Sequence, residues 1–196
     1  MKRILRYLVG TENHGLVIQR NQHKSIIGFS DADWATDTDD QKFTTGYCIY
    51  FGANIVSWSS HKQKVVSRSS TEAEYRSIAA VLAEILWLTS LLQELHIPTE
   101  VPKIYSDNLG AVQLASNPIM HSKTKHFELD LHFVRDNIQQ MRVQLIQLPT
   151  QFQIADLLTK PISGTTFSRI RDKLMVVINP TISLRGILNI INNTVT

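Results

Sequence analysis

Four acidic side chains, distant from one another in the chain, stand where a metal-binding carboxylate could act. Asp31 and Asp107 each follow a strand-like apolar run, Glu74 opens a long amphipathic helix, and Asp156 opens a short helical segment. Carboxylate oxygens are the ligands that hard divalent cations such as Mg²⁺ prefer. A pair of such ions can drive phosphodiester cleavage by activating water and stabilising the leaving oxygen. Any single one of the 17 Asp and Glu residues is by default a solvated surface charge, so the arrangement of these four carries the prediction.

Helical periodicity distinguishes the two glutamates at the start of the long helix. Glu74 lies four residues before Ile78 and seven before Val81, so it shares the apolar stripe and is predicted to point toward the sheet. Glu72 lies two residues earlier, about 160° away around the helix, and is predicted to face solvent. The alternative for Glu74 is a capping box with Thr71.

Strand and helix geometry leave the other three acids less sharply defined. Asp31 and Asp33 are two residues apart on one strand and face the same way, so spacing does not rank them. Asp107 is also suited to cap the helix that follows it, a role that is compatible with metal binding. Asp156 is equally an ordinary acid of a first helical turn, where the helix dipole favours negative charge. Sites in open α/β sheets form outside the carboxyl ends of the strands, which favours Asp31 and Asp107.

The elements that would position these acids follow from runs of β-branched and aromatic residues and from apolar residues at helical spacing. The predicted strands are GLVIQR, KSIIGFSDADWA, FTTGYCIYFG, ANIVSWSS, VPKIYSD and RVQLIQLP, with KVVSRSS either a further strand or the approach to the long helix. The predicted helices are MKRILRYLVGT, a long one that begins between Ser69 and Thr71 and stops before Pro98, NLGAVQLAS, HFELDLHFVRDNIQQ and QIADLLTKPI. Three consecutive strands suggest an antiparallel meander, and the strands that alternate with helices suggest parallel pairing. The order βββαβαβα, with an extra helix before the last strand, predicts an α/β fold.

Composition restricts the class of protein. The 196 residues suit one domain, and a hydrophobic content of 43% with a mean hydropathy of −0.08 fits a soluble globular protein. No apolar run reaches the length expected of a bilayer span, and the charged start lacks the apolar core of a signal peptide. The single cysteine, Cys48, excludes an internal disulfide framework and indicates a reducing, intracellular setting.

Positive charge is unevenly distributed, although the net charge is only +3. From Lys160 onward, five basic residues oppose one acid, and the segment WSSHKQKVVSR carries Lys62, Lys64 and Arg68 without an acid. Basic side chains beside an acidic cluster suit an enzyme that acts on a phosphate backbone, because they hold the polyanion while the carboxylates hold the metal. A solvated, lysine-rich hairpin is the alternative interpretation.

The sequence gives less support to a zinc site, a nucleophilic serine or a phosphate-binding loop. His121, His126 and His132 offer zinc ligands, but their spacing matches no common zinc finger and no cysteine is near. The serines lack a G-x-S-x-G context, and the chain has no glycine-rich phosphate loop.

Three long segments resemble, in the same order, the ribonuclease H domain of copia-type LTR retrotransposon Pol polyproteins. They are GFSDADWATDTDDQKFTTGYCIYFGANIVSWSSHKQKVVSRSSTEAEYRSIA, IYSDNLGAVQLASNPIMHSKTKHFELDLHFVRD and QIADLLTKPI. The ATDTDD part departs from the family, which more often has a glycine after the alanine. The resemblance covers roughly residues 25–175, the expected domain. Residues 1–24 resemble a remnant of the connection from a reverse transcriptase, and residues 176–196 are expected to form a poorly ordered tail. The chain is therefore expected to be the carboxyl-terminal piece of a longer polyprotein, or an orphan remnant that carries its own Met1.

The resemblance implies a ribonuclease H-like fold, with a mixed five-stranded sheet and helices on both faces. It implies that Asp31, Glu74, Asp107 and Asp156 bind two Mg²⁺ ions, or Mn²⁺ in their place, and form the catalytic site. The implied activity is hydrolysis of the RNA strand of an RNA–DNA hybrid during reverse transcription.

The resemblance also bears on nucleic-acid contacts and partners. His126 matches a histidine that is typical of the family, and both a phosphate contact and a structural role are open for it. We expect His126, Lys62, Lys64 and Arg68 to contact nucleic acid. The implied protein partner is the reverse transcriptase domain of the parent polyprotein, with no membrane and no disulfide partner, and the implied location is a cytoplasmic virus-like particle or the nucleus. The alternatives are a catalytically idle remnant that only binds nucleic acid, or another nuclease or recombinase of the same fold.

Overall fold

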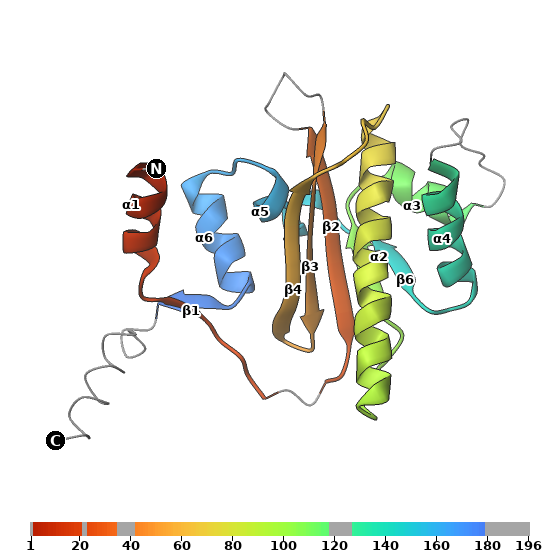
Figure 1. The fold of residues 1–196 in the computed structure, drawn as a ribbon, viewed down its shortest axis with the longest axis horizontal. Helices are drawn as coiled ribbons and strands as arrows, with labels where there is room; N and C mark the ends of the chain where they lie inside the picture. Colours follow the sequence, from red (N-terminus) through yellow and green to blue (C-terminus); the bar gives the residue numbers. More distant parts are fainter. Residues whose placement is uncertain (1, 21–22, 35–41, 118–126, 179–196) are drawn as a thin grey trace.

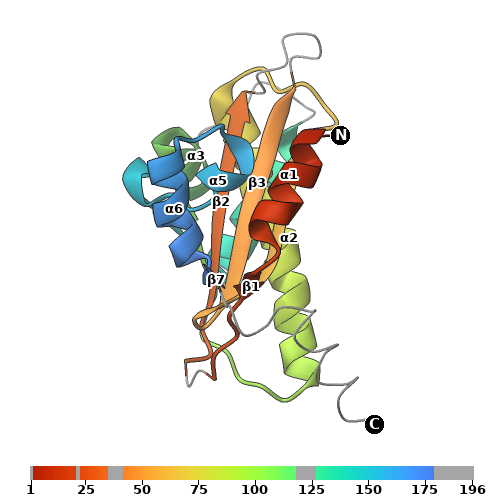
Figure 2. The same ribbon diagram turned by 90° about the vertical axis from the view of Figure 1, so that its left-hand side faces the viewer.

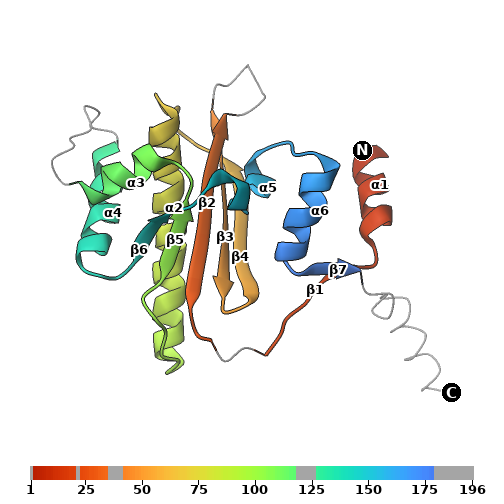
Figure 3. The same ribbon diagram turned by 180° about the vertical axis from the view of Figure 1, so that it is seen from behind.

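The computed structural model of the chain describes residues 2–20, 23–34, 42–117 and 127–178. At its centre lies a five-stranded mixed sheet with the strand order β4-β3-β2-β5-β6 (Figures 1 and 3). The strands are β2 (Ile26–Trp34), β3 (Phe43–Phe51), β4 (Asn54–Lys62), β5 (Lys103–Ser106) and β6 (Gln144–Gln147). The first three form an antiparallel meander, and β5 and β6 add to β2 in parallel. The predicted fold class, the order of elements βββαβαβα with an extra helix before the last strand, and the mixed pairing are confirmed.

Helices cover both faces of this sheet (Figures 1 and 3). One face carries α2 (Ser70–Glu94), with α3 (Leu109–Ser116) and α4 (Glu128–Gln139) beside it, and the other carries α5 (Asp156–Thr159) and α6 (Gly164–Lys173). A 3₁₀ turn, η2 (Thr150–Phe152), leads into α5. The larger core lies between α2 and the sheet, and the smaller lies beneath α5 and α6.

The long helix α2 is held against the central strand by close packing at Gly28. A Cβ atom at Gly28 would lie 2.9 Å from side-chain carbons of both Val81 and Ile85, so only glycine permits this approach. Val81 and Ile85 are fully buried. The helix begins where the sequence predicts, because the Ser69 hydroxyl accepts a hydrogen bond from the backbone N–H of Glu72 at 3.1 Å.

A second, two-stranded sheet joins the two ends of the described chain. Strand β1 (His14–Leu16) pairs antiparallel with β7 (Val176–Ile178), and α1 (Lys2–Thr11) precedes β1 (Figure 2). Strand β7 therefore lies inside the stretch 176–196 that was expected to be a tail, and residues 179–196 lie outside the described residues. Of the predicted strand GLVIQR, only Gly15 and Leu16 belong to β1. The segment KVVSRSS forms no strand and is the approach to α2, which was its alternative assignment.

Helix α2 is long and apolar enough to cross a membrane by length and composition alone. The prediction that no apolar run reaches the length of a bilayer span is therefore wrong for α2. Within the domain, however, eleven of its residues are buried, and their apolar side chains form the main core with the sheet. Packing in the core accounts for the apolar content of α2.

Candidate metal centre

Three of the four predicted carboxylates meet at one end of the sheet. Asp31, Asp107 and Asp156 each place a carboxylate oxygen within 4.8 Å of the others. Asp31 belongs to β2 and is fully buried, whereas Asp107 and Asp156 are partly exposed. One carboxylate of the acidic group is therefore shielded from solvent, and the other two border it.

The sheet and its connections explain why Asp31 and Asp107 meet. Strands β2 and β5 are parallel neighbours, so the residues at their carboxyl ends reach the same edge. The helix that follows β5 is capped by Asn108, whose side-chain oxygen accepts a hydrogen bond from the backbone N–H of Ala111 at 2.9 Å. Asp107 is therefore not the cap of α3, and its carboxylate faces the acidic group. Asp33, the alternative to Asp31 as the metal ligand on this strand, is partly exposed and is not a member of the acidic group.

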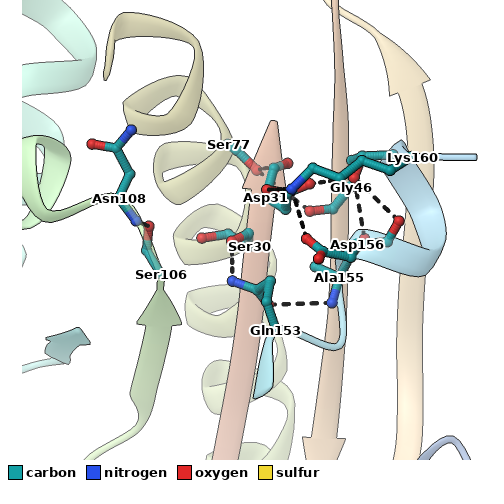
Figure 4. A network of polar contacts seen from close by, with 11 residues as sticks. Ser30, Asp31, Gly46, Ser77, Ser106, Asn108, Gln153, Ala155, Asp156 and Lys160 are labelled. Carbon is teal, nitrogen blue, oxygen red and sulfur yellow. Dashed lines mark hydrogen bonds and ion pairs between the residues drawn. The ribbon is translucent and has the colours of Figure 1, made fainter. Parts of the chain in front are cut away.

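Glu74 lies beside the three acids and is 6% exposed. Its carboxylate accepts a hydrogen bond from the backbone N–H of Ala32, which places it next to Asp31. Burial, and then the negative charge of Asp31, raise the pKa of Glu74 to about 9. Its Oε2 atom is buried and has no hydrogen-bond partner among the described residues. The start of α2 is fixed here by Ser77, whose hydroxyl donates to the carbonyl oxygen of Asp31 at 2.9 Å (Figure 4).

The prediction that Glu72 faces solvent is wrong. Glu72 is only 9% exposed, because its carboxylate closes the first turn of α2. One oxygen accepts a hydrogen bond from the backbone N–H of Arg68 at 3.0 Å, and the other forms an ion pair with Arg76 at 2.9 Å. Helical phase ranked Glu74 above Glu72 as the inward-facing acid, but it did not include the backbone and the arginine that cover Glu72.

Asp156 reaches the site because the segment before α5 is anchored to β2. The buried Gln153 side chain donates to the carbonyl oxygen of Ser30 at 2.9 Å and accepts from the backbone N–H of Ala155 at 3.2 Å (Figure 4). On the other side of α5, the hydroxyl of Ser60 in β4 donates to the carbonyl oxygen of Leu158 at 2.6 Å. Burial is the main cause that raises the pKa of Asp156.

Two further residues of the QIADLLTKPI segment contact the acids and were not predicted as members of the site. The Lys160 ammonium donates to Asp156 Oδ1 at 2.8 Å and to Asp31 Oδ1 at 3.1 Å (Figure 4). The Thr159 hydroxyl donates to Asp31 Oδ2. Burial acts to lower the pKa of Lys160, but its hydrogen bond to Asp156 and the charges of Asp31 and Asp156 raise that pKa above its ordinary value. The sequence contained one signal, since Lys160 follows Asp156 by four residues, the spacing of an ion pair on a helix.

This donor set fits a hard divalent cation. It consists of carboxylate oxygens, three of which lie within 4.8 Å of one another, and it is accompanied by the unpartnered Oε2 of Glu74. Histidine contributes nothing to the group within the described residues: His132 is exposed, while His121 and His126 lie outside those residues. The expected contact of His126 with nucleic acid therefore also lies outside them.

The predicted basic residues lie near the same end of the sheet. Thr44 of β3 is paired with Lys62 on one side and with Asp33 on the other, so Lys62 ends β4 at the level of the acidic strand end. Lys64 and Arg68 follow in the connection to α2, and all three basic residues are exposed.

The buried side chain of Gln63 anchors this connection to β3 and α2. The Gln63 side chain donates to the hydroxyl of Thr45 and to the carbonyl oxygen of Ala73, at 3.0 Å each, and accepts from Ser67 at 2.8 Å.

The sheet order and the helices on both faces define an α/β domain with a ribonuclease H-like fold. Among solved structures, LC11-RNase H1, isolated from compost, superposes with a TM-score of 0.53 at 16% identity and covers 69% of this chain and 93% of that one. The N-terminal RNase H domain of a Mycobacterium tuberculosis protein gives a TM-score of 0.51 at 13% identity, covering 76% and 96%. At these identities the likeness establishes the fold.

Sequence relatives identify the family more closely. The chain is 49% identical over 177 residues to the retrovirus-related Pol polyprotein from transposon RE1 of Arabidopsis thaliana, and 35% identical over 167 residues to that from transposon TNT 1-94 of Nicotiana tabacum. These matches cover 90% and 85% of the chain but only 12% of each polyprotein. No family model matches the chain. Close homologues of the chain are therefore Pol polyproteins of copia-type transposons, and the chain corresponds to one segment of them, with the ribonuclease H fold.

Proposed function

We propose that the domain is a metal-dependent endoribonuclease of the ribonuclease H type, which hydrolyses the RNA strand of RNA–DNA hybrids during reverse transcription. The observation that carries the proposal is the convergence of Asp31, Asp107 and Asp156 within 4.8 Å, with the buried Glu74 beside them. The fold supports the same class, and LC11-RNase H1 has also been solved in complex with an RNA/DNA hybrid. The Pol polyprotein relatives agree with a role in reverse transcription.

The catalytic arrangement assigns each side chain a task. Asp31, Glu74, Asp107 and Asp156 would hold two Mg²⁺ or Mn²⁺ ions, and bound ions of this kind activate water and stabilise the departing 3′ oxygen. Asp31 is oriented by the Thr159 hydroxyl, and Glu74 by the backbone N–H of Ala32. Because the pKa of Glu74 is raised to about 9, its carboxyl group retains a proton at neutral pH until a cation displaces it.

The exposed basic residues would hold the substrate. Lys62, Lys64 and Arg68 present positive charge close to the acidic end of the sheet, where they would bind the phosphate backbone of the hybrid. Such contacts fix the position of a duplex without reading its sequence. Selectivity for RNA would come from contacts with 2′-hydroxyl groups across the minor groove.

The decisive experiment compares two neighbouring acids of the same strand. Asp31→Asn should reduce Mg²⁺-dependent cleavage of a labelled RNA–DNA hybrid by roughly 100-fold or more, since it removes a metal ligand. Asp33→Asn is the matched control and should retain most of the activity, because Asp33 is not a member of the acidic group. Undiminished cleavage by the Asp31 variant would remove Asp31 from the mechanism.

Two further arms of this assay separate the alternatives. Hybrid binding by the wild-type chain without any Mg²⁺-dependent cleavage would identify a catalytically idle, nucleic-acid-binding remnant. Preferred cleavage of duplex DNA would identify a different nuclease or recombinase of the same fold.

We also propose a reverse transcriptase domain as the partner within the polyprotein. Addition of that domain in trans should then increase the rate of hybrid cleavage.

A further inference from the structure

The ammonium group of Lys160 lies between two of the carboxylates that are proposed to bind metal. It donates to Asp156 Oδ1 at 2.8 Å and to Asp31 Oδ1 at 3.1 Å. We propose that Lys160 is an internal counter-ion of the metal centre: it neutralises Asp31 and Asp156 in the metal-free protein and is displaced from them when a divalent cation binds. This inference rests on the proposed function, since it assumes that these acids bind metal.

Geometry makes the two cations mutually exclusive. Mg²⁺ lies about 2.1 Å from its oxygen ligands, so an ion bound to both Oδ1 atoms would occupy the space between them that the nitrogen of Lys160 already fills. The other oxygen of Asp31 accepts the hydroxyl of Thr159. Both oxygens of the fully buried Asp31 are therefore engaged by α5 and the residue after it. Of the two donors, only the ammonium carries a positive charge that a metal ion would repel.

The structure gives Lys160 a way to leave without unfolding α5. Its backbone is fixed as the C-cap of that helix, where its N–H donates to the carbonyl oxygen of Asp156 at 2.9 Å. Its side chain is 29% exposed, whereas that of Asp31 is 1% exposed. Rotation of the lysine side chain can therefore carry the ammonium into water while both carboxylates stay in place. Removal of the lysine charge should then strengthen metal binding, whereas a lysine that merely positions Asp156 should weaken metal binding when it is removed.

The test measures Mn²⁺ binding to the whole chain by isothermal titration calorimetry, without nucleic acid. Lys160→Met, which keeps the length of the side chain and removes its charge, should bind Mn²⁺ roughly tenfold more tightly than the wild type, a factor that corresponds to about 1.4 kcal/mol. Lys160→Arg should bind with nearly wild-type affinity, because the positive charge remains. Lys64→Met is the matched control: it removes a charge at an exposed position outside the acidic group, and should leave the affinity within about twofold, because exposed charges are screened by salt.

The outcomes separate this inference from the proposed function. Equal or weaker Mn²⁺ binding by Lys160→Met, with normal binding by the wild type, overturns the counter-ion role and leaves the metal site standing. Absence of Mn²⁺ binding from both proteins overturns the metal site, and the counter-ion role with it. Equal gains in Lys160→Met and Lys64→Met would show a general effect of charge and would also overturn the inference.

Thermal unfolding supplies a second measurement that does not depend on activity. In buffer with EDTA, Lys160→Met should melt at a lower temperature than the wild type, because Asp31 and Asp156 lose their counter-ion. Saturating Mn²⁺ should then raise the melting temperature of Lys160→Met by more than it raises that of the wild type. An equal increase in both proteins would contradict displacement of the lysine.

Discussion

Asp31 and Gly46 lie directly opposite each other in the antiparallel pair of β2 and β3. The missing side chain of Gly46 is what allows α5 to approach the sheet at this point. A Cβ atom there would lie 2.5 Å from Thr159 Cγ2 and 2.9 Å from Leu158 Cβ. The residue opposite the buried acid thus determines how closely the helix that carries Asp156 can approach.

Gly46→Ala should therefore damage the metal centre without altering any acid. Because the added methyl group overlaps α5, we expect a loss of about 1–3 kcal/mol in the free energy of unfolding, as for other overpacked sites. We also expect Mn²⁺ affinity to fall, because α5 must move away from Asp31. Urea unfolding and calorimetric Mn²⁺ titration measure the two effects.

A matched control is available at Gly164, the first residue of α6. A Cβ atom at Gly164 meets nothing within 4 Å, so Gly164→Ala should change neither stability nor Mn²⁺ affinity appreciably. If Gly46→Ala binds Mn²⁺ with wild-type affinity, the close approach of α5 to the sheet does not determine the affinity of the metal centre.

Glu74 should make the stability of the metal-free protein depend on pH. Its pKa is raised to about 9 by burial and by Asp31, so between pH 5 and pH 9 (roughly the interval between its unfolded and folded pKa values) the folded state holds a proton that the unfolded state has lost. The free energy of unfolding must then fall as pH rises through this range, by at most about 1.4 kcal/mol per pH unit for one proton. Urea unfolding at several pH values in the presence of EDTA measures this slope.

Glu74→Gln should flatten that slope, because glutamine has no proton to lose. Glu94→Gln, at the exposed end of the same helix, is the control and should keep the wild-type slope. The raised pKa of Lys160 does not interfere, since it contributes stability that is lost only above the ordinary pKa of lysine. An unchanged slope in Glu74→Gln would show that Glu74 is not the titrating group.

The elements that the sequence predicts well are those with a strong and local pattern. Helix α2 begins at Ser70, within the predicted interval from Ser69 to Thr71, because a capping residue and a long apolar stripe agree. Helix α6 was missed because its sequence, GTTFSRIRDK, contains few apolar residues. Strand β7 was missed and β1 covers only two residues of the predicted strand GLVIQR, because each has three residues and depends on a partner more than 150 residues away.

The ends of three helices show a different limit. Two residues beyond the last residue of α2, α4 and α6, the backbone is left-handed, at His96 (φ 56°), Met141 (φ 54°) and Met175 (φ 59°), where glycine is the usual signal. Pro98 predicted the end of α2 to within a few residues, but no proline follows α4 in the same way.

In the candidate metal centre, Asp31, Asp107 and Asp156 could be proposed because strand and helix ends are local features of the sequence. The contact of Lys160 with Asp31 could not, because it depends on the tertiary packing of α5.

Lys62, Lys64 and Arg68 should contribute to affinity for nucleic acid rather than to cleavage chemistry. Replacing all three by Gln should weaken binding of an RNA–DNA hybrid and reduce the slope of log K against log salt by roughly one for each lost phosphate contact. Fluorescence anisotropy over a range of KCl concentrations measures both quantities, with Ca²⁺ in place of Mg²⁺ to prevent cleavage. Lys103→Gln is the control, because Lys103 starts β5 at the end remote from Asp107, and it should leave the slope unchanged. A triple variant with the wild-type slope would exclude these residues from the nucleic-acid interface.

Gln153 should position Asp156 through the two hydrogen bonds that tie the start of α5 to β2. Gln153→Leu keeps a similar volume but removes both bonds, and Gln153 is only 2% exposed, so we expect a loss of about 1–3 kcal/mol in the free energy of unfolding. Mn²⁺ affinity should also fall by roughly tenfold, the usual effect of removing a group that orients a metal ligand. Gln151→Leu, two residues earlier and exposed, is the matched control and should behave as the wild type. If Gln153→Leu is destabilised but binds Mn²⁺ with wild-type affinity, its hydrogen bonds support the fold and not the position of Asp156.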